Sequence, residues 1–153
     1  MAGDGPLADQ VAEAARTVPG VSWLGKLDTA GVREQMRGAA LLAVPSVWYE
    51  GGPMTMIEGW GVGLPVVGSD LGAMSSMIQP GENGLLFRPG DAGELAAQVR
   101  WLWAHPEERQ RMRGGALQTF QDTYSPQRNY DQLIRIYGDA LERASMTRRS
   151  PRH

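Results

Sequence analysis

The sequence contains no cysteine, and this absence removes several kinds of site. A chain without cysteine has no disulfide framework, no thiolate metal site and no cysteine nucleophile. Aromatic side chains are scarce (7%), only one lysine is present, and no apolar run approaches the ~20 residues that a membrane-spanning helix needs. The formal charge of −2 provides no basic field for nucleic acid. We therefore expect no nucleic-acid partner, no transmembrane segment and no metal site, and the lack of cysteine fits the cytoplasm.

Length and patterning indicate one α/β domain. The 153 residues, 42% of them hydrophobic, are enough for a single sizeable core. Short apolar runs bounded by Gly, Pro or Asp alternate with helical periodicity, which is typical of βα units that build a parallel sheet. Strands are predicted at residues 21–24, 40–44, 65–68 and 84–87. The sequence thus predicts a Rossmann-like parallel sheet flanked by helices.

Helices are predicted on both sides of these strands. Residues 7–16 and 31–38 carry helical patterns, and from Asp91 the chain is expected to be wholly helical. Pro106 and Pro126 each stand where a new helix can begin, because proline is tolerated in a first turn and disruptive later. Residues 1–144 are therefore assigned to the domain. Residues 145–153 are polar and basic without apolar periodicity, and we expect them to form a disordered tail.

The most informative segment is the loop that follows the strand at 40–44. It contains Glu50, Gly51 and Gly52, and a helix is predicted to begin at about Pro53. Glycine lets a ligand approach the backbone, and the start of a helix presents free N–H groups and the positive end of its dipole. Such a site suits a phosphate or a sugar hydroxyl.

Glu58 lies at the border of the apolar face of that predicted helix. A carboxylate at the rim of a buried face needs hydrogen-bond partners. Two vicinal ribose hydroxyls would provide them, but a structural arginine or a backbone N–H would do so without any function. Spacing alone leaves both explanations open.

At this point the residues resemble a known family. Glu50, seven residues, Glu58 and then Gly63-Leu64-Pro65-Val66-Val67 are similar to the E-x7-E signature and the following strand of retaining GT-B glycosyltransferases, family four in particular. Further segments resemble the same family in the same order, at residues 2–7, 21–25, 69–72 and 81–87. The resemblance covers nearly the whole chain and identifies it with the C-terminal, donor-binding domain of a GT-B fold, truncated on its N-terminal side and lacking its first strands.

The resemblance implies roles for these residues. Glu58 would hold the ribose hydroxyls, and Glu50 would lie against the donor sugar as the catalytic residue. The loop and the helix start would contact the sugar and diphosphate through Gly51, Gly52, Pro53, Met54 and Thr55. The backbone of a second loop would border the base, at Gly25, Lys26 and Leu27. The donor would be a UDP-, GDP- or ADP-sugar, with no cofactor and no obligatory metal.

Two expected parts of such an enzyme have no match in the chain. The family's basic pair, an arginine and a lysine that neutralise the leaving diphosphate, precedes the matched segments, and Lys26 sits too far along to replace it. The acceptor-binding domain, which supplies a catalytic histidine, has no counterpart, and neither His105 nor His153 matches a family site. We therefore expect the full enzyme to be a glycosyltransferase of hexosyltransferase type, and the chain alone to be inactive.

Three hypotheses about the function remain open from the sequence. The chain is the donor-binding half of a glycosyltransferase, or a non-catalytic remnant that binds a nucleotide sugar, or a GT-B scaffold with epimerase or phosphorylase chemistry. In the resembled fold the strand order 3-2-1-4-5-6 would leave a gap between the strands at 21–24 and 40–44. An open parallel sheet recruits other strands, so a homo-oligomer is expected unless the chain re-pairs its own strands. The expected location is the cytoplasm, and a full-length enzyme could also lie peripherally at a membrane.

Overall fold

The structure is a computed structural model, and it describes residues 1–49 and 51–149. Two compact units divide the chain, Met1–Ala40 and Leu41–His153. Each unit has its own internal contacts and is described by itself.

The first unit contains two helices and an extended pairing. Helix α1 spans Ala8–Thr17 and helix α2 spans Thr29–Gly38, both close to the predicted ranges. Helix α2 begins earlier than residue 31 because the Asp28 side chain accepts a hydrogen bond from the backbone N–H of Gly31 at 2.8 Å and caps the first turn.

Residues 21–24 do not form the strand that the apolar pattern predicts. The first residues of the chain run beside them instead. The N–H of Leu24 donates to the carbonyl of Met1 at 2.8 Å, and the N–H of Gly3 donates to the carbonyl of Gly25 at 2.8 Å. These few bonds make a short pairing inside the first unit, which is separate from the sheet of the second.

The second unit is built on a parallel sheet of three strands in the described part of the chain. Strand β1 is Leu42–Val44, β2 is Val66–Ser69 and β3 is Gly84–Phe87, in the spatial order β1-β2-β3. Leu42 is in register with Val66, and Val66 with Gly84. All three strands fall where the sequence predicts them. The homo-oligomer expected through an open sheet stays a prediction.

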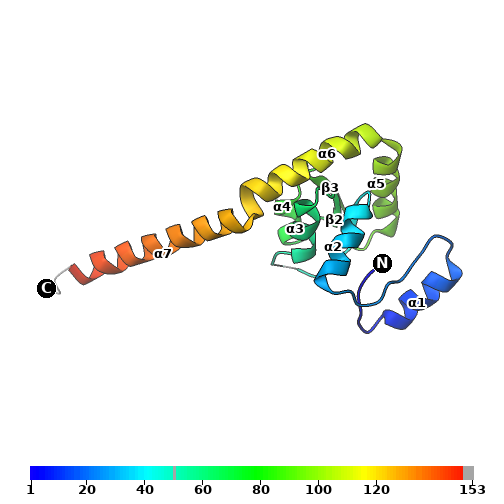
Figure 1. Cartoon of the computed structure of the whole chain (residues 1–153), viewed down its shortest axis with the longest axis horizontal. Helices are drawn as coiled ribbons and strands as arrows, with labels where there is room; N and C mark the ends of the chain where they lie inside the picture. The colour runs from blue at the N-terminus through cyan, green and yellow to red at the C-terminus, as the bar shows by residue number, and fades with distance from the viewer. Residues whose placement is uncertain (50, 150–153) are drawn as a thin grey trace. The chain divides into compact units, whose positions relative to one another are not determined.

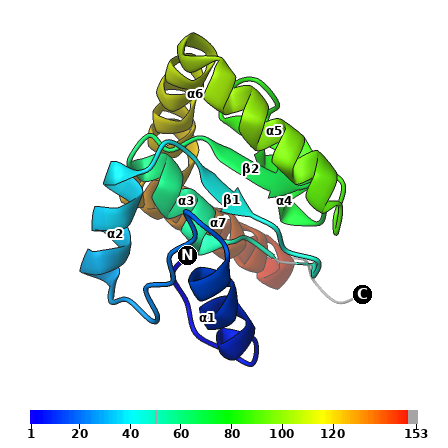
Figure 2. The same ribbon diagram turned by 90° about the vertical axis from the view of Figure 1, so that its right-hand side faces the viewer.

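Helices cover the two faces of this sheet. Helix α3 (Met54–Gly61) connects β1 to β2, α4 (Ala73–Met77) connects β2 to β3, and α5 (Ala92–Ala104) follows β3. Figure 1 shows α3 and α4 on one side of the strands and α5 on the other, and Figure 2, viewed from the side of α5, shows this helix crossing over the strands. Such coverage is what a parallel sheet requires.

Successive residues of β2 point into two different hydrophobic clusters. Val66 packs with Met56 and Trp60 of α3, whereas Val67 packs with Phe87 and Leu102 on the other face. This alternation is the period of two that a strand imposes on its side chains. The sheet therefore anchors α3 from one side and α5 from the other.

The C-terminal helices begin at the prolines that the sequence marks. Helix α6 spans Pro106–Thr119, a π-helical turn η1 spans Phe120–Tyr124, and α7 spans Pro126–Arg149. Residues 145–149, predicted to belong to a disordered tail, continue the helix, because no residue before Pro151 interrupts it. Residues 150–153 lie outside the described residues.

A buried amide side chain joins three elements of the second unit. Asn83 is fully buried just before β3. Its Oδ1 accepts a hydrogen bond from the N–H of Gln79 at 2.8 Å, and its Nδ2 donates to the carbonyl of Met77 and the hydroxyl of Thr119, both at 3.2 Å. One side chain thus pairs with backbone groups at and just after the end of α4 and connects them to Thr119 at the end of α6.

The main chain of Asn83 continues the same junction. Its carbonyl accepts hydrogen bonds from the indole Nε1–H of Trp60 at 3.0 Å and from the N–H of Val66 at 3.3 Å. Trp60 is itself fully buried, with its ring 5.7 Å from that of Tyr124. Burial raises the pKa of the Tyr124 phenol above its ordinary value. The turn before β3 therefore also holds α3, the helix that follows the candidate loop.

We predict that Asn83→Ala strongly destabilises the fold. The change leaves the N–H of Gln79 and the carbonyl of Met77 without their hydrogen-bond partner. Each buried polar group left without a partner lowers the free energy of unfolding by about 1–3 kcal/mol. For the two groups together the loss is about 2–6 kcal/mol. At about 2–4 °C per kcal/mol for a chain of this size, the melting temperature should fall by roughly 4–24 °C. Thermal unfolding followed by circular dichroism measures it.

Asn129→Ala is the matched control, because Asn129 is exposed on α7 and should tolerate the change. Asn83→Asp keeps the acceptor for Gln79 and loses both donated bonds, so it should fall between the two. Equal melting temperatures for Asn83→Ala and Asn129→Ala would contradict the role of the amide.

Candidate functional site

The loop between β1 and α3 crosses the carboxyl edge of the sheet. Strand β1 ends at Val44, and α3 begins at Met54. The helix is held against the sheet by two fully buried side chains, Met56 and Trp60. In open parallel sheets the carboxyl edge is where ligands bind, so the fold places the loop at a binding edge.

The start of α3 offers two unpaired donors. Its N-cap is Pro53, which makes no side-chain cap, and the Pro53 carbonyl accepts hydrogen bonds from the N–H groups of Met56 and Ile57. In the part of the chain that the structure describes, no group accepts a hydrogen bond from the N–H of Met54 or Thr55. These two N–H groups stand at the positive end of the helix dipole.

Met54, one of the residues assigned to the sugar and diphosphate, is the first residue of α3. Its side chain is exposed. The residue belongs to the open surface of the loop.

Gly51 and Gly52 border open space. A Cβ built on either residue would meet no atom within 4 Å. At Gly84, by contrast, a Cβ would lie 2.2 Å from the carbonyl oxygen of Val66, so packing against the neighbouring strand demands glycine there. Packing inside the described chain therefore does not explain the two loop glycines.

Glu58 is half-buried on α3, one turn after Met54. Its carboxylate makes no hydrogen bond and no ion pair with residues 1–49 and 51–149. The structural arginine or backbone N–H that could have explained this carboxylate is therefore absent from the described residues. Glu50, the other glutamate of the motif, lies outside them.

Gly25, Lys26 and Leu27 belong to the first unit, in the loop that leads to α2. Gly25 has a φ of +62° and accepts the hydrogen bond from Gly3. Lys26 is exposed and makes no ion pair with the described residues. The structure brings the predicted residues 51–55 and Glu58 together in the second unit, and residues 25–27 together in the first.

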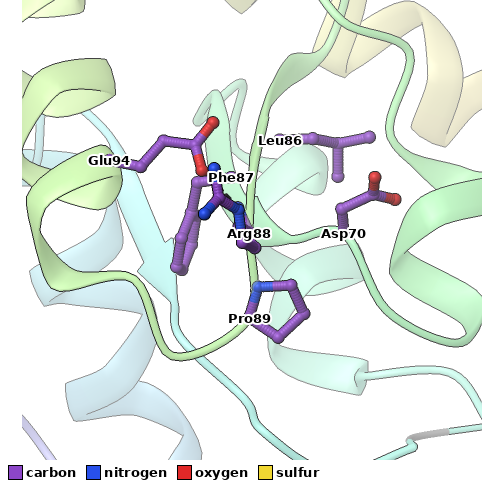
Figure 3. A pocket seen from close by; sticks show the side chains of 6 residues that line it. All are labelled: Asp70, Leu86, Phe87, Arg88, Pro89 and Glu94. Carbon is purple, nitrogen blue, oxygen red and sulfur yellow. Dashed lines mark hydrogen bonds between the residues drawn. The ribbon is translucent and has the colours of Figure 1, made fainter.

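A hollow that the sequence did not suggest lies at the ends of β2 and β3. Its volume is about 420 Å³, and Figure 3 shows Arg88 and Pro89 between Asp70 and Glu94. Asp70 accepts a hydrogen bond from the Ser75 hydroxyl at 2.6 Å, and Glu94 accepts one from the N–H of Arg88 at 2.8 Å. The sequence signal that could have indicated this hollow is the pair of polar residues directly after two parallel strands, Asp70 and Arg88. Their hydrogen bonds hold the loops before α4 and α5 in place.

None of the helices in residues 1–49 and 51–149 is both long and apolar enough to cross a bilayer. The same residues contain no group of three or more His, Asp or Glu side chains placed to hold a metal ion.

The sequence is similar to a known family and to individual curated proteins. A sequence model of the family described as "Glycosyl transferases group 1" matches residues 1–105. The chain is 32% identical over 120 residues to the D-inositol 3-phosphate glycosyltransferase of Stackebrandtia nassauensis, covering 77% of this chain and 26% of that one. It is 30% identical over 116 residues to the D-rhamnosyltransferase WbpZ of Pseudomonas aeruginosa, covering 73% and 30%. The chain thus spans less than a third of the length of these relatives.

Solved structures share the fold. The sucrose-phosphate synthase of Thermosynechococcus elongatus superimposes with a TM-score of 0.78 at 23% identity, covering 89% of this chain and 34% of that one. The HepE protein of Anabaena in complex with UDP gives a TM-score of 0.78 at 20% identity, covering 90% and 40%. With a family match over about two thirds of its length and this α/β architecture, the chain belongs to the group 1 glycosyl transferases and has a GT-B-type fold.

Proposed function

We propose that this chain supplies the donor-binding half of an enzyme that transfers a glycosyl group from a nucleoside diphosphate sugar to an acceptor, with retention of configuration. The observation that carries the proposal is the Glu58 carboxylate, half-buried and without a partner among the described residues. A carboxylate kept in such a place lacks a structural explanation and is available to a ligand.

The groups around Glu58 match the parts of a nucleotide sugar. The carboxylate can accept hydrogen bonds from two vicinal ribose hydroxyls. The free N–H groups of Met54 and Thr55 can donate to a diphosphate oxygen at the positive end of α3. The open space over Gly51 and Gly52 admits a sugar ring close to the backbone.

In the proposed transfer, the bond between the anomeric carbon and the diphosphate oxygen breaks, and a bond from that carbon to an acceptor oxygen forms. The proton of the acceptor hydroxyl passes to the departing diphosphate or to solvent. Negative charge builds up on the departing diphosphate, so donors aimed at it lower the barrier. Glu50 would lie against the sugar. The names of the relatives support this chemistry, and HepE structures with UDP and with UDP-glucose support the donor class.

A second candidate, binding of a nucleotide sugar without turnover, has its own supporting observation. No lysine or arginine occurs between Arg37 and Arg88, the stretch that holds the whole loop and α3. Cations that would neutralise a leaving diphosphate must therefore come from outside this stretch. Catalysis by the second unit alone is not expected.

We predict that Glu58→Gln weakens binding of free UDP, GDP or ADP to the 153-residue chain. Loss of a charge-assisted bidentate contact should cost about 1.5–3 kcal/mol, or roughly a ten- to 150-fold rise in Kd. Isothermal titration calorimetry measures it. Glu107→Gln, at an exposed glutamate of α6, is the matched control and should leave Kd unchanged.

Glu50→Gln adds a second comparison. It should weaken the binding of a nucleotide sugar more than the binding of the free nucleotide, because Glu50 is assigned to the sugar. Equal losses for Glu50→Gln and Glu58→Gln with free nucleoside diphosphate would refute the assignment of both glutamates.

We also predict that Gly51→Ala impairs binding of a nucleotide sugar without harming the fold. A Cβ there meets no protein atom, so stability should change by no more than about 0.5 kcal/mol. The added methyl group would instead occupy the space assigned to the sugar, so the Kd for UDP-glucose or GDP-mannose should rise. Differential scanning fluorimetry and calorimetry give the two readouts.

Gly84→Ala is the structural counterpart. Its Cβ would overlap the Val66 carbonyl oxygen, and overpacking of this kind costs about 1–3 kcal/mol or more. A lower melting temperature for Gly51→Ala than for Gly84→Ala would show that the loop glycine serves packing, contrary to the proposal.

A further inference from the structure

The loop after β1 carries two aromatic side chains that are almost fully in water. Trp48 is 75% exposed and Tyr49 is 84% exposed. They directly precede the position of Glu50, and Gly51 and Gly52 follow it. The exposure of both side chains shows that neither ring is packed inside the described part of the fold.

The other four tryptophans of the chain all have partners. Trp60 donates to the Asn83 carbonyl, and the indole of Trp23 donates to the Gly3 carbonyl at 3.0 Å. Trp101 stacks on His105 with 4.6 Å between ring centroids, and the Arg109 guanidinium lies 5.5 Å from the Trp103 ring centroid. Trp48 alone has neither a ring contact nor an indole hydrogen bond with the described residues.

An exposed indole and an exposed phenol at successive positions of the chain are costly to keep in water. Apolar surface is less stable by about 25 cal/mol per Å² when it is exposed than when it is buried. Tryptophan and tyrosine combine a large flat apolar face with an N–H or O–H at the rim, and they are therefore enriched where a ligand or partner covers them. The two residues belong to the loop after β1, and in the sequence they stand shortly before the open glycines. This place in the chain indicates a ligand of the same site.

We propose that Trp48 and Tyr49 form a stacking surface for a pyranose ring. This inference rests on the proposed function, which brings a sugar to this loop. A pyranose has an apolar face of C–H groups, which matches an aromatic ring, and a rim of hydroxyls, which matches the indole N–H and the phenol O–H. No charged side chain is needed, in keeping with the absence of lysine and arginine from this stretch. The ring belongs either to the donor sugar or to a sugar of the acceptor.

The direct test follows the indole N–H signals of the ¹⁵N-labelled 153-residue chain by NMR. Methyl α-D-glucopyranoside and methyl α-D-mannopyranoside are titrated, with sorbitol as an acyclic polyol that has hydroxyls but no ring face. The Trp48 signal, identified by its loss in Trp48→Phe, should move saturably with at least one pyranoside and not with sorbitol. An unmoved Trp48 signal, or one that moves equally with sorbitol, overturns the proposal.

Affinities separate the two sources of the ring. If it is the donor sugar, Trp48→Ala and Tyr49→Ala should each raise the Kd of UDP-glucose or GDP-mannose about five- to tenfold and leave that of UDP or GDP unchanged. In the variants the pyranoside response is followed at the backbone amide signals of Gly51 and Gly52, and in Tyr49→Ala also at the Trp48 indole signal. If the ring is an acceptor sugar, this response disappears in both variants while both nucleotide affinities stay. Trp103→Ala removes a tryptophan of α5 that is 69% exposed and should change neither. Amide shifts of Gly51 and Gly52 in Trp48→Ala and Tyr49→Ala equal to those of the parent chain count against stacking.

The test also distinguishes this inference from the function on which it rests. Failure of every nucleoside diphosphate to bind, with a saturable Trp48 response to pyranosides, refutes the nucleotide site and keeps the stacking surface. Nucleotide binding that depends on Glu58, together with a Trp48 signal that no pyranoside moves, keeps the nucleotide site and refutes the stacking surface.

Discussion

The hydrogen bonds of Asn83 hold the second unit together where its elements would otherwise separate. The amide fastens the end of α4 to the end of α6, and the carbonyl of the same residue holds the indole of Trp60 in α3. Trp60 lies two residues after Glu58, on the buried side of the same helix. The orientation of α3, and with it the direction of the Glu58 carboxylate and of the free N–H groups at its start, therefore depends on a turn that is distant in sequence.

Much of this architecture could be predicted because local signals coincide with it. Glycine and proline bound the short apolar runs of the three strands, and Pro106 and Pro126 mark the starts of α6 and α7. The strand predicted at 21–24 was wrong because an apolar run becomes a strand only when a neighbour supplies a ladder, and here the first residues of the chain make only a few such bonds.

The site could be predicted in part. The spacing of Glu50 and Glu58 and the paired glycines pointed to the loop, but spacing left the structural and the functional explanations of Glu58 equally open. The difference between them is the absence of a partner among the described residues, which depends on where every other side chain lies. Trp48 and Tyr49 are a similar case, since exposure is a property of the folded chain. Asn83 gave no signal, because an asparagine in a turn usually faces water.

The loop and α3 combine an uncharged helix start with a long stretch that has no basic residue, from Arg37 to Arg88. A polyphosphate held there would be bound by backbone N–H dipoles at short range rather than by side-chain cations. Mobile ions screen long-range attraction between net charges, but they have little effect on hydrogen bonds made in contact. The attraction that this stretch exerts on a polyphosphate would therefore depend little on ionic strength, and a steep salt dependence of binding would report on residues outside the stretch.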